Sequence, residues 1–408
     1  MKLPTLIIGG GISGITAAVE LAEAGQEVVL IEKEPYLGGN VSHFNNYFPK
    51  LCPPACGLEI NYRRIRSNPR ISYYTGAEMK DFTGEEGDFK VQLSIQASLI
   101  NKKCTSCGKC AEVCPVERSV ESGSLLSGGN RAAYIDGGLA FPMKYTIDGE
   151  VCEREACGKC LEVCDYDAIQ LDAQPAEIEL QVHKIIVATG WKLYDAARLE
   201  NYSYSDEPDV ITNLEFEYLL SQCTRENKKL TRPSDGQTPE RIAFIQCAGS
   251  RDLNHLPYCS AVCCSVSLKH ALTLAENYPQ MKSEIFYIDL RLAGRNEKLL
   301  NKEEANPQVI LTKGKVGRIR RDGQKEGLLL EVEDTMAGSR RMDRFDLVVL
   351  AMGLTPNYIQ KDLAVNEHGF YSSNQVPGLY PAASCKRPMD VASSVRDATA
   401  AALKAMQR

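Results

Sequence analysis

The first thirty residues constrain the fold of this chain more than any other feature. Residues 3–8 are apolar and suit a buried strand, and a glycine-rich turn over residues 9–14 follows them directly. Residues 15–24 repeat apolar side chains at helical spacing, and residues 26–32 have the pattern of a second strand. A strand, a helix and a strand in this order predict one β-α-β unit of a parallel sheet.

The turn of this unit has the chemistry of a dinucleotide site. Gly9, Gly11 and Gly14 fit the pattern G-x-G-x-x-G, and Glu32 follows the last glycine by 18 residues. Glycines let the backbone turn tightly and approach a pyrophosphate, while the helix N-terminus offers unpaired N–H groups to the phosphates. Glu32 can accept a hydrogen bond from a ribose hydroxyl. The pattern therefore predicts a bound dinucleotide, and the alternative is a tight turn with a structural role only.

Other segments resemble the FAD-binding flavoproteins of thioredoxin reductase type. A glycine-rich turn, Leu37-Gly38-Gly39-Asn40, follows the second strand; strand 184–187 ends in Ala188-Thr189-Gly190, and strand 346–350 ends in Ala351-Met352-Gly353. The resemblance implies that FAD is the dinucleotide and that both strands pack around it. Cys385 stands near where the superfamily has the Asp of Ala-Gly-Asp, so N–H groups of helix 391–406 would hold the phosphate. The expected cofactor contacts are Gly9, Gly11, Ser13, Gly14, Glu32, Lys33, Gly39, Asn40, Ala188, Thr189, Gly190, Gly353, Cys385 and Asp390.

Sixteen cysteines are unusual for a chain that does not begin like a secreted protein. A charged segment followed by a long apolar segment and a cleavage site is missing at the start, so disulfides are not expected. Eight of the cysteines form two runs, Cys104-x2-Cys107-x2-Cys110-x3-Cys114-Pro and Cys152-x4-Cys157-x2-Cys160-x3-Cys164.

The first run has the ferredoxin spacing for a [4Fe-4S] cluster, in which the fourth cysteine binds the neighbouring cluster. The swapped arrangement predicts one cluster on Cys104, Cys107, Cys110 and Cys164, and another on Cys152, Cys157, Cys160 and Cys114. A pair of structural zinc sites is the alternative, although zinc favours two separated C-x-x-C pairs.

A third group of cysteines follows the strand predicted over residues 241–246. It consists of Cys247, Cys259, Cys263 and Cys264. Two adjacent thiolates can each reach a different iron of one cluster, whereas they crowd around a single tetrahedral zinc ion. An ordinary buried cysteine group and a redox disulfide are the alternatives. The glycine fingerprint for NADPH, expected after this strand in thioredoxin-reductase-like proteins, is absent, so an iron–sulfur site has replaced a hydride-donor site.

These residues resemble the A-subunit family of heterodisulfide reductase over nearly the whole chain. The resemblance is carried by Cys247-x-Gly-Ser-Arg, Pro257-Tyr-Cys-Ser, Val262-Cys-Cys with Lys269 five residues on, and Cys385-x2-Pro-x-Asp390. It implies a third [4Fe-4S] cluster on the four cysteines, and it implies that Lys269 is a catalytic residue near the flavin ring. A solvated helix lysine is the alternative. The compact form, which ends soon after the flavin domain, is similar to the A-subunit of the quinone-interacting membrane-bound oxidoreductase of sulfate reducers.

The expected fold is α/β: a thioredoxin-reductase-like flavoprotein with two Rossmann units and an inserted ferredoxin-like domain with two clusters. We expect a FAD-binding domain built from residues 1–100, 171–239 and 341–408, the insert at residues 101–170, and a second Rossmann-like domain with the four cysteines at residues 240–340. The insert is expected to depend on its clusters rather than on an apolar core.

The predicted function is electron transfer within a multi-subunit oxidoreductase in the cytoplasm. A net charge of -6 argues against a nucleic-acid binder, and no apolar run approaches the roughly 20 residues that span a bilayer. By resemblance, the partners are adenylylsulfate reductase, a second flavin and iron–sulfur subunit, and a quinone-reactive membrane subunit, with flavin-based bifurcation or confurcation as an option. One alternative is a self-contained flavin disulfide reductase that uses Cys52 and Cys56, or Cys263 and Cys264. Another is a scaffold whose clusters are purely structural.

Overall fold

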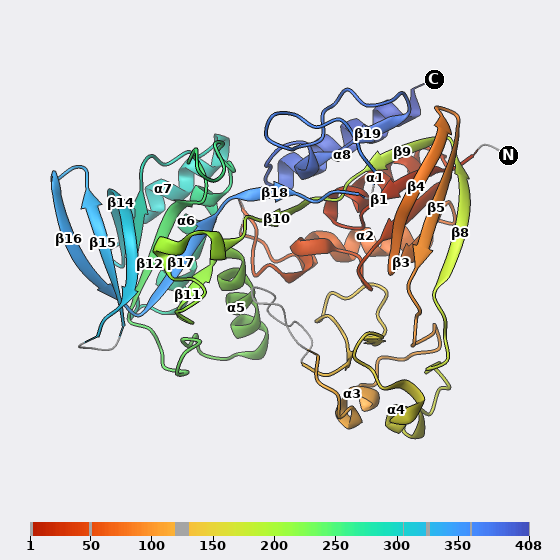
Figure 1. The fold of residues 1–408 in the computed structure, drawn as a ribbon, viewed down its shortest axis with the longest axis horizontal. Helices are drawn as coiled ribbons and strands as arrows, with labels where there is room; N and C mark the ends of the chain where they lie inside the picture. Colours follow the sequence, from red (N-terminus) through yellow and green to blue (C-terminus); the bar gives the residue numbers. More distant parts are fainter. Residues whose placement is uncertain are drawn as a thin grey trace.

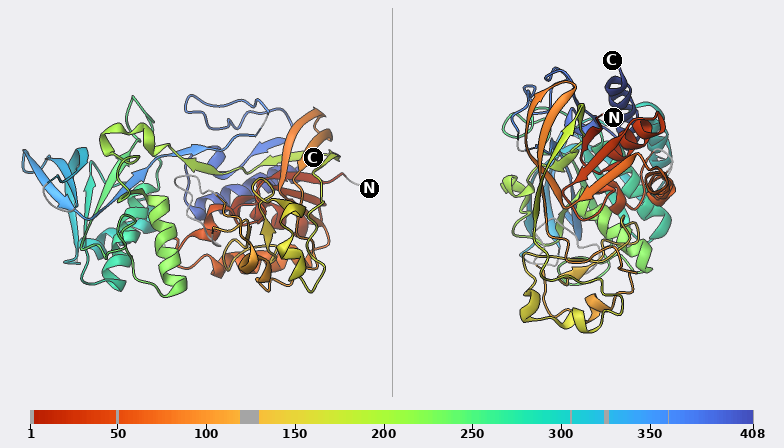
Figure 2. Two further views of the ribbon diagram at one scale, coloured as in Figure 1. Left: turned by 60° about the horizontal axis from the view of Figure 1, so that its bottom comes forward. Right: turned by 90° about the vertical axis from the view of Figure 1, so that its right-hand side faces the viewer.

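A computed structural model describes residues 3–48, 51–118, 130–304, 306–323, 327–359 and 361–407. Two α/β units lie side by side, and the cysteine-rich insert lies below the first of them (Figure 1). The right-hand view in Figure 2 again shows the insert at one end of the first unit.

The first unit is built on a five-stranded parallel sheet in the order β19-β9-β1-β2-β3. Its strands are β1 (Thr5–Ile8), β2 (Val28–Glu32), β3 (Ile71–Thr75), β9 (Lys184–Val187) and β19 (Leu379–Pro381). The helices α1 (Ile12–Glu23), α2 (Ala55–Ser67) and α8 (Val391–Met406) cover one face of the sheet (Figure 1). The predicted β-α-β unit is therefore present as β1, α1 and β2.

Alternation along the central strands explains why both faces of this sheet are covered. Side chains of successive strand residues point to opposite faces. Ile7 and Ile186 pack in the apolar core with helix α1, whereas Leu6 and Ile185 pack with a second, smaller sheet. That smaller antiparallel sheet has the order β4-β5-β8 and consists of β4 (Ala77–Glu85), β5 (Asp88–Ile95) and β8 (Ala176–Val182).

The insert leaves this small sheet after β5 and returns at β8. It contains α3 (Lys109–Val113), α4 (Lys159–Glu162) and a short antiparallel pair, β6 (Ala133–Tyr134) and β7 (Thr146–Ile147). Its apolar core is small, and the cysteines themselves pack against it. Part of the insert, residues 119–129, lies outside the described residues.

The second unit has a seven-stranded sheet in the order β11-β17-β12-β13-β14-β15-β16. Its strands are β11 (Val210–Thr212), β12 (Arg241–Ala248), β13 (Lys282–Tyr287), β14 (Val309–Arg321), β15 (Leu328–Asp334), β16 (Ser339–Phe345) and β17 (Leu347–Met352). The helices are α5 (Asn213–Glu226), α6 (Cys263–Asn277) and α7 (Glu297–Glu304). A two-stranded antiparallel ribbon of β10 (Trp191–Leu193) and β18 (Leu354–Pro356) joins the two units. Short 3-10 helices occupy Gly39–His43, Arg154–Ala156, Ala196–Arg198, Glu200–Tyr202, Gly294–Asn296 and Ala383–Cys385.

The predicted domain boundaries are wrong in two places. Strand β11 and helix α5, expected in the flavin segment 171–239, belong to the second unit. Strand β17, expected in the flavin segment 341–408, pairs in parallel with β11 and β12 of the second unit. Short apolar strands that end near glycine look alike in the two units, and only their pairing partners distinguish them.

Candidate functional site

A large cleft opens at the carboxyl ends of the strands of the first unit. Its volume is about 910 Å³, at the upper end of the range for small-molecule sites. Most of the predicted cofactor contacts line it: Gly9, Gly11, Ser13, Glu32, Lys33, Gly39, Asn40, Ala188, Thr189, Gly190 and Asp390. These residues come from loops far apart in the sequence, and the parallel sheet brings them to one edge.

The glycines make room for both the backbone and the ligand. A Cβ atom on Gly14 would lie 1.8 Å from the carbonyl oxygen of Gly9, so only glycine allows α1 to start this close to β1. A Cβ atom on Gly39, where φ is +56°, would lie 3.0 Å from the Cα atom of Gly11. The two glycine turns therefore approach each other closely and expose backbone to the cleft, as a pyrophosphate requires.

Glu32 ends β2 in the position that a ribose contact requires. Its carboxylate is buried and accepts hydrogen bonds from the backbone N–H groups of Gly10, at 2.6 Å, and Glu34, at 2.9 Å. Burial raises the pKa of this carboxyl, and the two N–H groups partly offset that effect. The hydrogen bonds fix the carboxylate at the cleft, where it can accept a ribose hydroxyl.

Three predicted contacts do not line the cleft. Gly14 lies behind the floor, at the packing contact between helix and strand. Cys385 is fully buried and its thiol donates to the carbonyl oxygens of Ala382 and Val187, so its side chain packs in the core. Gly353 lies in the second unit, where a Cβ atom would clash with Ser250 and Leu256. The sequence pattern around Cys385 and Gly353 correctly predicted where strands end. It did not predict that Cys385 packs in the core or that Gly353 lies away from the cleft.

Lys269 reaches the cleft from helix α6 of the second unit. Its ammonium group is buried and donates to the Glu217 carboxylate at 2.5 Å and to the carbonyl oxygen of Asn46 at 2.7 Å. It lies 5.8 Å from the centre of the Phe44 ring. The alternative of a solvated lysine is therefore wrong, and the structure places this cation in the wall of the cleft.

Glu217 on α5 holds an ion cluster together. One carboxylate oxygen accepts from Lys269 and from His270 Nε2, and the other accepts from the N–H groups of Asn45, at 2.9 Å, and Asn46, at 3.3 Å. Burial alone would raise the pKa of Glu217, but Lys269 and His270 outweigh it and lower the pKa to about 2. Burial lowers the pKa of both Lys269 and His270, and Glu217 partly offsets this. Glu217 and His270 were missed in the sequence, where the only signal is an acid on the apolar face of α5 beside Phe216.

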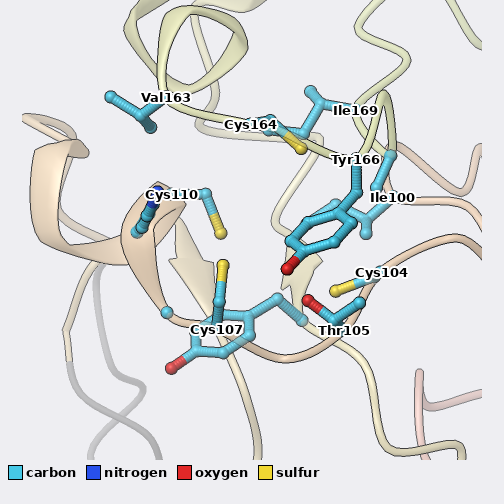
Figure 3. Close-up of a pocket in the computed structure, with 13 residues that line it drawn as sticks. Ile100, Cys104, Thr105, Cys107, Cys110, Val163, Cys164, Tyr166 and Ile169 are labelled. Atoms are coloured by element: carbon cyan, nitrogen blue, oxygen red, sulfur yellow. The ribbon is translucent and has the colours of Figure 1, made fainter.

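The first predicted cluster set comes together in the insert. Cys104, Cys107, Cys110 and Cys164 line one cavity, and their sulfur atoms turn toward a common space (Figure 3). The first three come from the loop before α3 and from α3 itself, whereas Cys164 follows α4. This is the swapped set that the spacing predicts. Burial raises the pKa of Cys110 to about 12, and the nearby Cys104 thiol adds to the effect.

The second predicted set also gathers on the other side of the insert. Burial raises the pKa of the Cys160 thiol, and Cys152, Cys157 and Cys114 contribute electrostatically to that rise. Cys160 is thus close to the other three members of its predicted set, including Cys114 from the first run.

The four cysteines of the second unit meet at the carboxyl end of β12. Cys247 lies at a bulge with φ of +60°, and Cys263 and Cys264 begin helix α6. Burial raises the pKa of Cys263 well above its ordinary value, and Cys264, Cys247 and Cys259 all add to the rise. Around this set, which we call the four-cysteine motif, Arg251 Nη1 lies 3.9 Å from the Cys247 sulfur, and the N–H group of Arg291 donates to Cys264 at 3.5 Å.

The donors of all three sets are thiols, which suit iron–sulfur clusters and also a tetrahedral zinc ion. Each set offers four thiols and no carboxylate or imidazole among its predicted ligands. In the described ranges, no three His, Cys, Asp or Glu side chains lie close enough together to bind one metal ion. A cubane separates its thiolates more widely because each binds a different iron. Iron would also supply the positive charge that a buried thiolate lacks.

Comparison with known proteins agrees with this arrangement. A family described as FAD dependent oxidoreductase matches residues 5–51, and a 4Fe-4S binding domain matches residues 98–117. The chain is 37% identical to an iron-sulfur A-subunit of CoB--CoM heterodisulfide reductase from Methanopyrus kandleri, covering 98% of this chain and 63% of the relative. It is 35% identical to the corresponding A-subunit of Methanocaldococcus jannaschii, with 97% and 63% covered.

Over nearly its whole length, the chain is similar to A-subunits of heterodisulfide reductase. It spans 63% of the length of these two relatives. It spans 52% of a third, the A-subunit of the ferredoxin/F(420)H(2)-dependent CoB-CoM heterodisulfide reductase of Methanosarcina acetivorans, to which it is 34% identical. FAD and [4Fe-4S] binding follow from the two matching families.

The fold of this chain is that of thioredoxin reductase with a ferredoxin insert. The thioredoxin reductases of Lactococcus lactis and T. acidophilum superpose with TM-scores of 0.54 and 0.53, at 14% and 15% identity. The superpositions cover 99% of this chain and 98% and 97% of those two chains. The predicted fold class is confirmed. Among the described residues, no helix is long and apolar enough to cross a bilayer.

Proposed function

We propose that this chain is the electron-transfer subunit of a multi-subunit oxidoreductase, with FAD and three [4Fe-4S] clusters. The observation that carries the proposal is the position of the four-cysteine motif. It lies at the carboxyl end of β12, the edge where a parallel nucleotide-binding unit holds its coenzyme. The turn after β12 has thiols where a nicotinamide site needs glycines, so electrons would reach the flavin through iron.

The two kinds of cofactor would exchange different numbers of electrons, and Lys269 and Glu217 would act on the flavin. A flavin exchanges two electrons, whereas each cluster exchanges one. Lys269 would place a positive charge beside the bound flavin and stabilise the negative charge that develops there on reduction. Glu217 keeps the ammonium group in place and is a positioning residue, because it acts through Lys269.

The insert is attached to the flavin cleft itself. The N–H group of Leu37, in the turn that lines the cleft, donates to the carbonyl oxygen of Phe141 in the insert at 2.7 Å. The rings of Phe141 and Tyr62 stack at 4.7 Å, and Tyr36 donates to the carbonyl oxygen of Lys144 at 2.9 Å. This contact supports a route from the flavin through the two insert clusters to a partner protein.

The partners are proposed from relatives and from resemblance. The relatives are A-subunits of heterodisulfide reductases, which supports a role for this chain beside further subunits. On the resemblance to the quinone-interacting oxidoreductase of sulfate reducers, we propose three partners: adenylylsulfate reductase, a second flavin and iron–sulfur subunit, and a quinone-reactive membrane subunit. The complex would lie in the cytoplasm, attached to the membrane through its partners, and could bifurcate or confurcate electrons at the flavin.

Anaerobic purification with iron, sulfide and flavin analysis tests the proposal. We expect FAD and about twelve irons per chain, four for each cluster. About eight irons or fewer would remove the cluster on the four-cysteine motif and overturn the proposal. Clusters that are all present but stay redox-silent in a titration followed by electron paramagnetic resonance would favour the scaffold function instead.

A flavin disulfide reductase is the second candidate, and one observation favours it. Tyr47 lines the cleft, and its pKa is raised by burial and by the nearby thiols of Cys56 and Cys52. Two free cysteines therefore lie near the wall of the cleft that would hold the flavin. Bleaching of the flavin by NADPH in the isolated protein, together with reduction of a disulfide substrate that Cys56→Ser abolishes, would support this function.

A further inference from the structure

The interface between β12 and α6 buries several polar atoms that lack partners. Both polar atoms of the Gln246 amide, Oγ of Ser267 and Nδ1 of His270 are buried and have no hydrogen-bond partner in the described part of the chain. The three side chains are at most 6% exposed. Buried polar atoms are almost always hydrogen-bonded, so several unpartnered atoms in one interface require an explanation.

The topology places these three side chains in one row. Helix α6 packs against β12, and its Ser267 and His270 lie three residues apart, on one helix face. The His270 ring lies 6.1 Å from the ring of Phe244 on β12. Gln246 is two residues further along β12, beside the bulge at Cys247, and its side chain is buried like those of Ser267 and His270. Moving from Phe244 to Gln246 advances the strand by about 6.6 Å, or roughly four helix residues, to the level of Ser267.

The row connects the two sites described above. At one end, His270 Nε2 binds Glu217 Oε2, the same oxygen that accepts from Lys269 in the flavin cleft. Because a carboxylate only accepts, His270 carries its hydrogen on Nε2 and leaves Nδ1 as an acceptor. At the other end, Cys263 of the four-cysteine motif precedes Ser267 by one helical turn on the same buried face.

We propose that ordered water occupies this interface and completes a hydrogen-bonded path from the flavin cleft to the four-cysteine motif. Water suits the site because the unpartnered atoms include donors and acceptors: the Gln246 amide offers both, Ser267 offers both, and His270 Nδ1 accepts. A buried water typically makes about three such bonds. A direct bond between these side chains would satisfy only some of the atoms.

The path gives the interior a way to balance charge. If the motif holds a cluster, His270 Nδ1 would take up one proton from solvent through the path for each electron that a reductant such as dithionite gives to that cluster. The dithionite would be oxidised, and the proton would offset the added negative charge in the interior. The charged groups that face the path are Glu217 and Lys269 at the cleft and Arg251, Asp289 and Arg291 at the motif.

Redox titrations at several pH values test the path, with Gln246→Leu and Ser267→Ala as variants. In the wild-type protein we expect the midpoint potential of the motif cluster to fall as pH rises, because a proton accompanies the electron. Each variant should lose most of this pH dependence while keeping its iron and flavin. Thr273→Val is the matched control, since its hydroxyl bonds only to the Lys269 carbonyl oxygen of its own helix, and it should behave as wild type.

A high-resolution crystal structure of the wild-type protein gives a second, independent test. Water density bonded to Gln246, Ser267 and His270 is the expected result, and an interface without water would overturn the inference. So would a cluster potential that does not change with pH, or variants that titrate like the control. The inference rests on the proposed function because it needs a cluster on the motif. The iron count separates the two failures: too little iron overturns the function, whereas full iron with a dry interface overturns only the path.

Discussion

The flavin cleft and the ferredoxin insert hold their cofactors by opposite means. The cleft is shaped by backbone: glycines that approach within van der Waals distance, strands with fully apolar surroundings and a buried ion cluster. The insert has short helices, a small core in which cysteines take part, and thiols whose pKa values burial raises. We therefore expect the cleft to form without its ligand and the insert to depend on its clusters for folding.

Removal of iron should have the largest effect, because it should unfold the insert and leave the flavin domain folded. Anaerobic treatment with an iron chelator should unfold residues 101–170 while the flavin domain stays folded, because the insert loses the bonds that replace a core. Hydrogen exchange measured by mass spectrometry should show protection lost in the insert and kept in β1 and α1. Equal protection in both regions would mean that the insert is held by its apolar contacts, and reconstitution with iron and sulfide should restore protection.

Breaking the ion cluster should have the next largest effect. Glu217→Gln leaves the Lys269 ammonium buried without its counter-charge, at an expected cost of about 3–5 kcal/mol in the free energy of unfolding. Denaturant unfolding of the flavin-loaded protein measures this, and Thr273→Val on α6 serves as the control. The flavin potential should also change, whereas a purely structural glutamate would leave that potential at its wild-type value.

The buried Glu217 carboxylate also predicts how the free energy of unfolding depends on pH. The pKa of Glu217 falls from 4.5 to about 2 on folding, so its contribution is fully present above pH 4.5 and is lost between pH 4.5 and about 2. A shift of this size corresponds to about 3 kcal/mol. Glu217→Gln should therefore flatten the acid limb of the stability curve in that window, and an unchanged acid limb would contradict the assignment.

A change at Gly14, behind the floor of the cleft, should have a comparable or smaller effect. Gly14→Ala places a methyl group 1.8 Å from the carbonyl oxygen of Gly9, and overpacking of this kind costs about 1–3 kcal/mol. Flavin content should drop as the two turns move apart. Gly138→Ala in the insert is the control, because nothing lies within 4 Å of its added Cβ atom. If both variants retained flavin equally, the close contact at Gly14 would not shape the site.

The smallest effect concerns helix ends. Helix α5, which carries Glu217, begins with a capping box in which Thr212 and Glu215 satisfy each other's backbone N–H groups. Helix α3 of the insert begins at left-handed Gly108 without any side-chain cap. Thr212→Ala should cost about 1 kcal/mol, measured as a lower melting temperature, while Ser221→Ala in the middle of α5 controls for loss of a hydroxyl.

The sequence predicted those parts of the site that depend on local spacing. The β1-α1-β2 unit and the exchange of Cys114 and Cys164 between the two cysteine sets follow from fixed intervals along the chain, and the structure has both. Sheet membership of β11 and β17 depends on pairing partners far apart in sequence, so it was misjudged. Glu217 and His270 were missed for the same reason: each is unremarkable in its own helix, and their contact exists only after α5 and α6 pack.

The pairing of β5 with β8 has a consequence for how such a protein can change over evolution. Ile95 and Ala176 are register partners on adjacent antiparallel strands, yet 80 residues and the two predicted cluster sites separate them in the sequence. In the β4-β5-β8 sheet, the insert therefore takes the place of the loop that joins two strands of a hairpin. A single insertion or deletion between β5 and β8 could therefore add or remove the whole cysteine-rich insert. Every strand of the flavoprotein would keep its pairing partners.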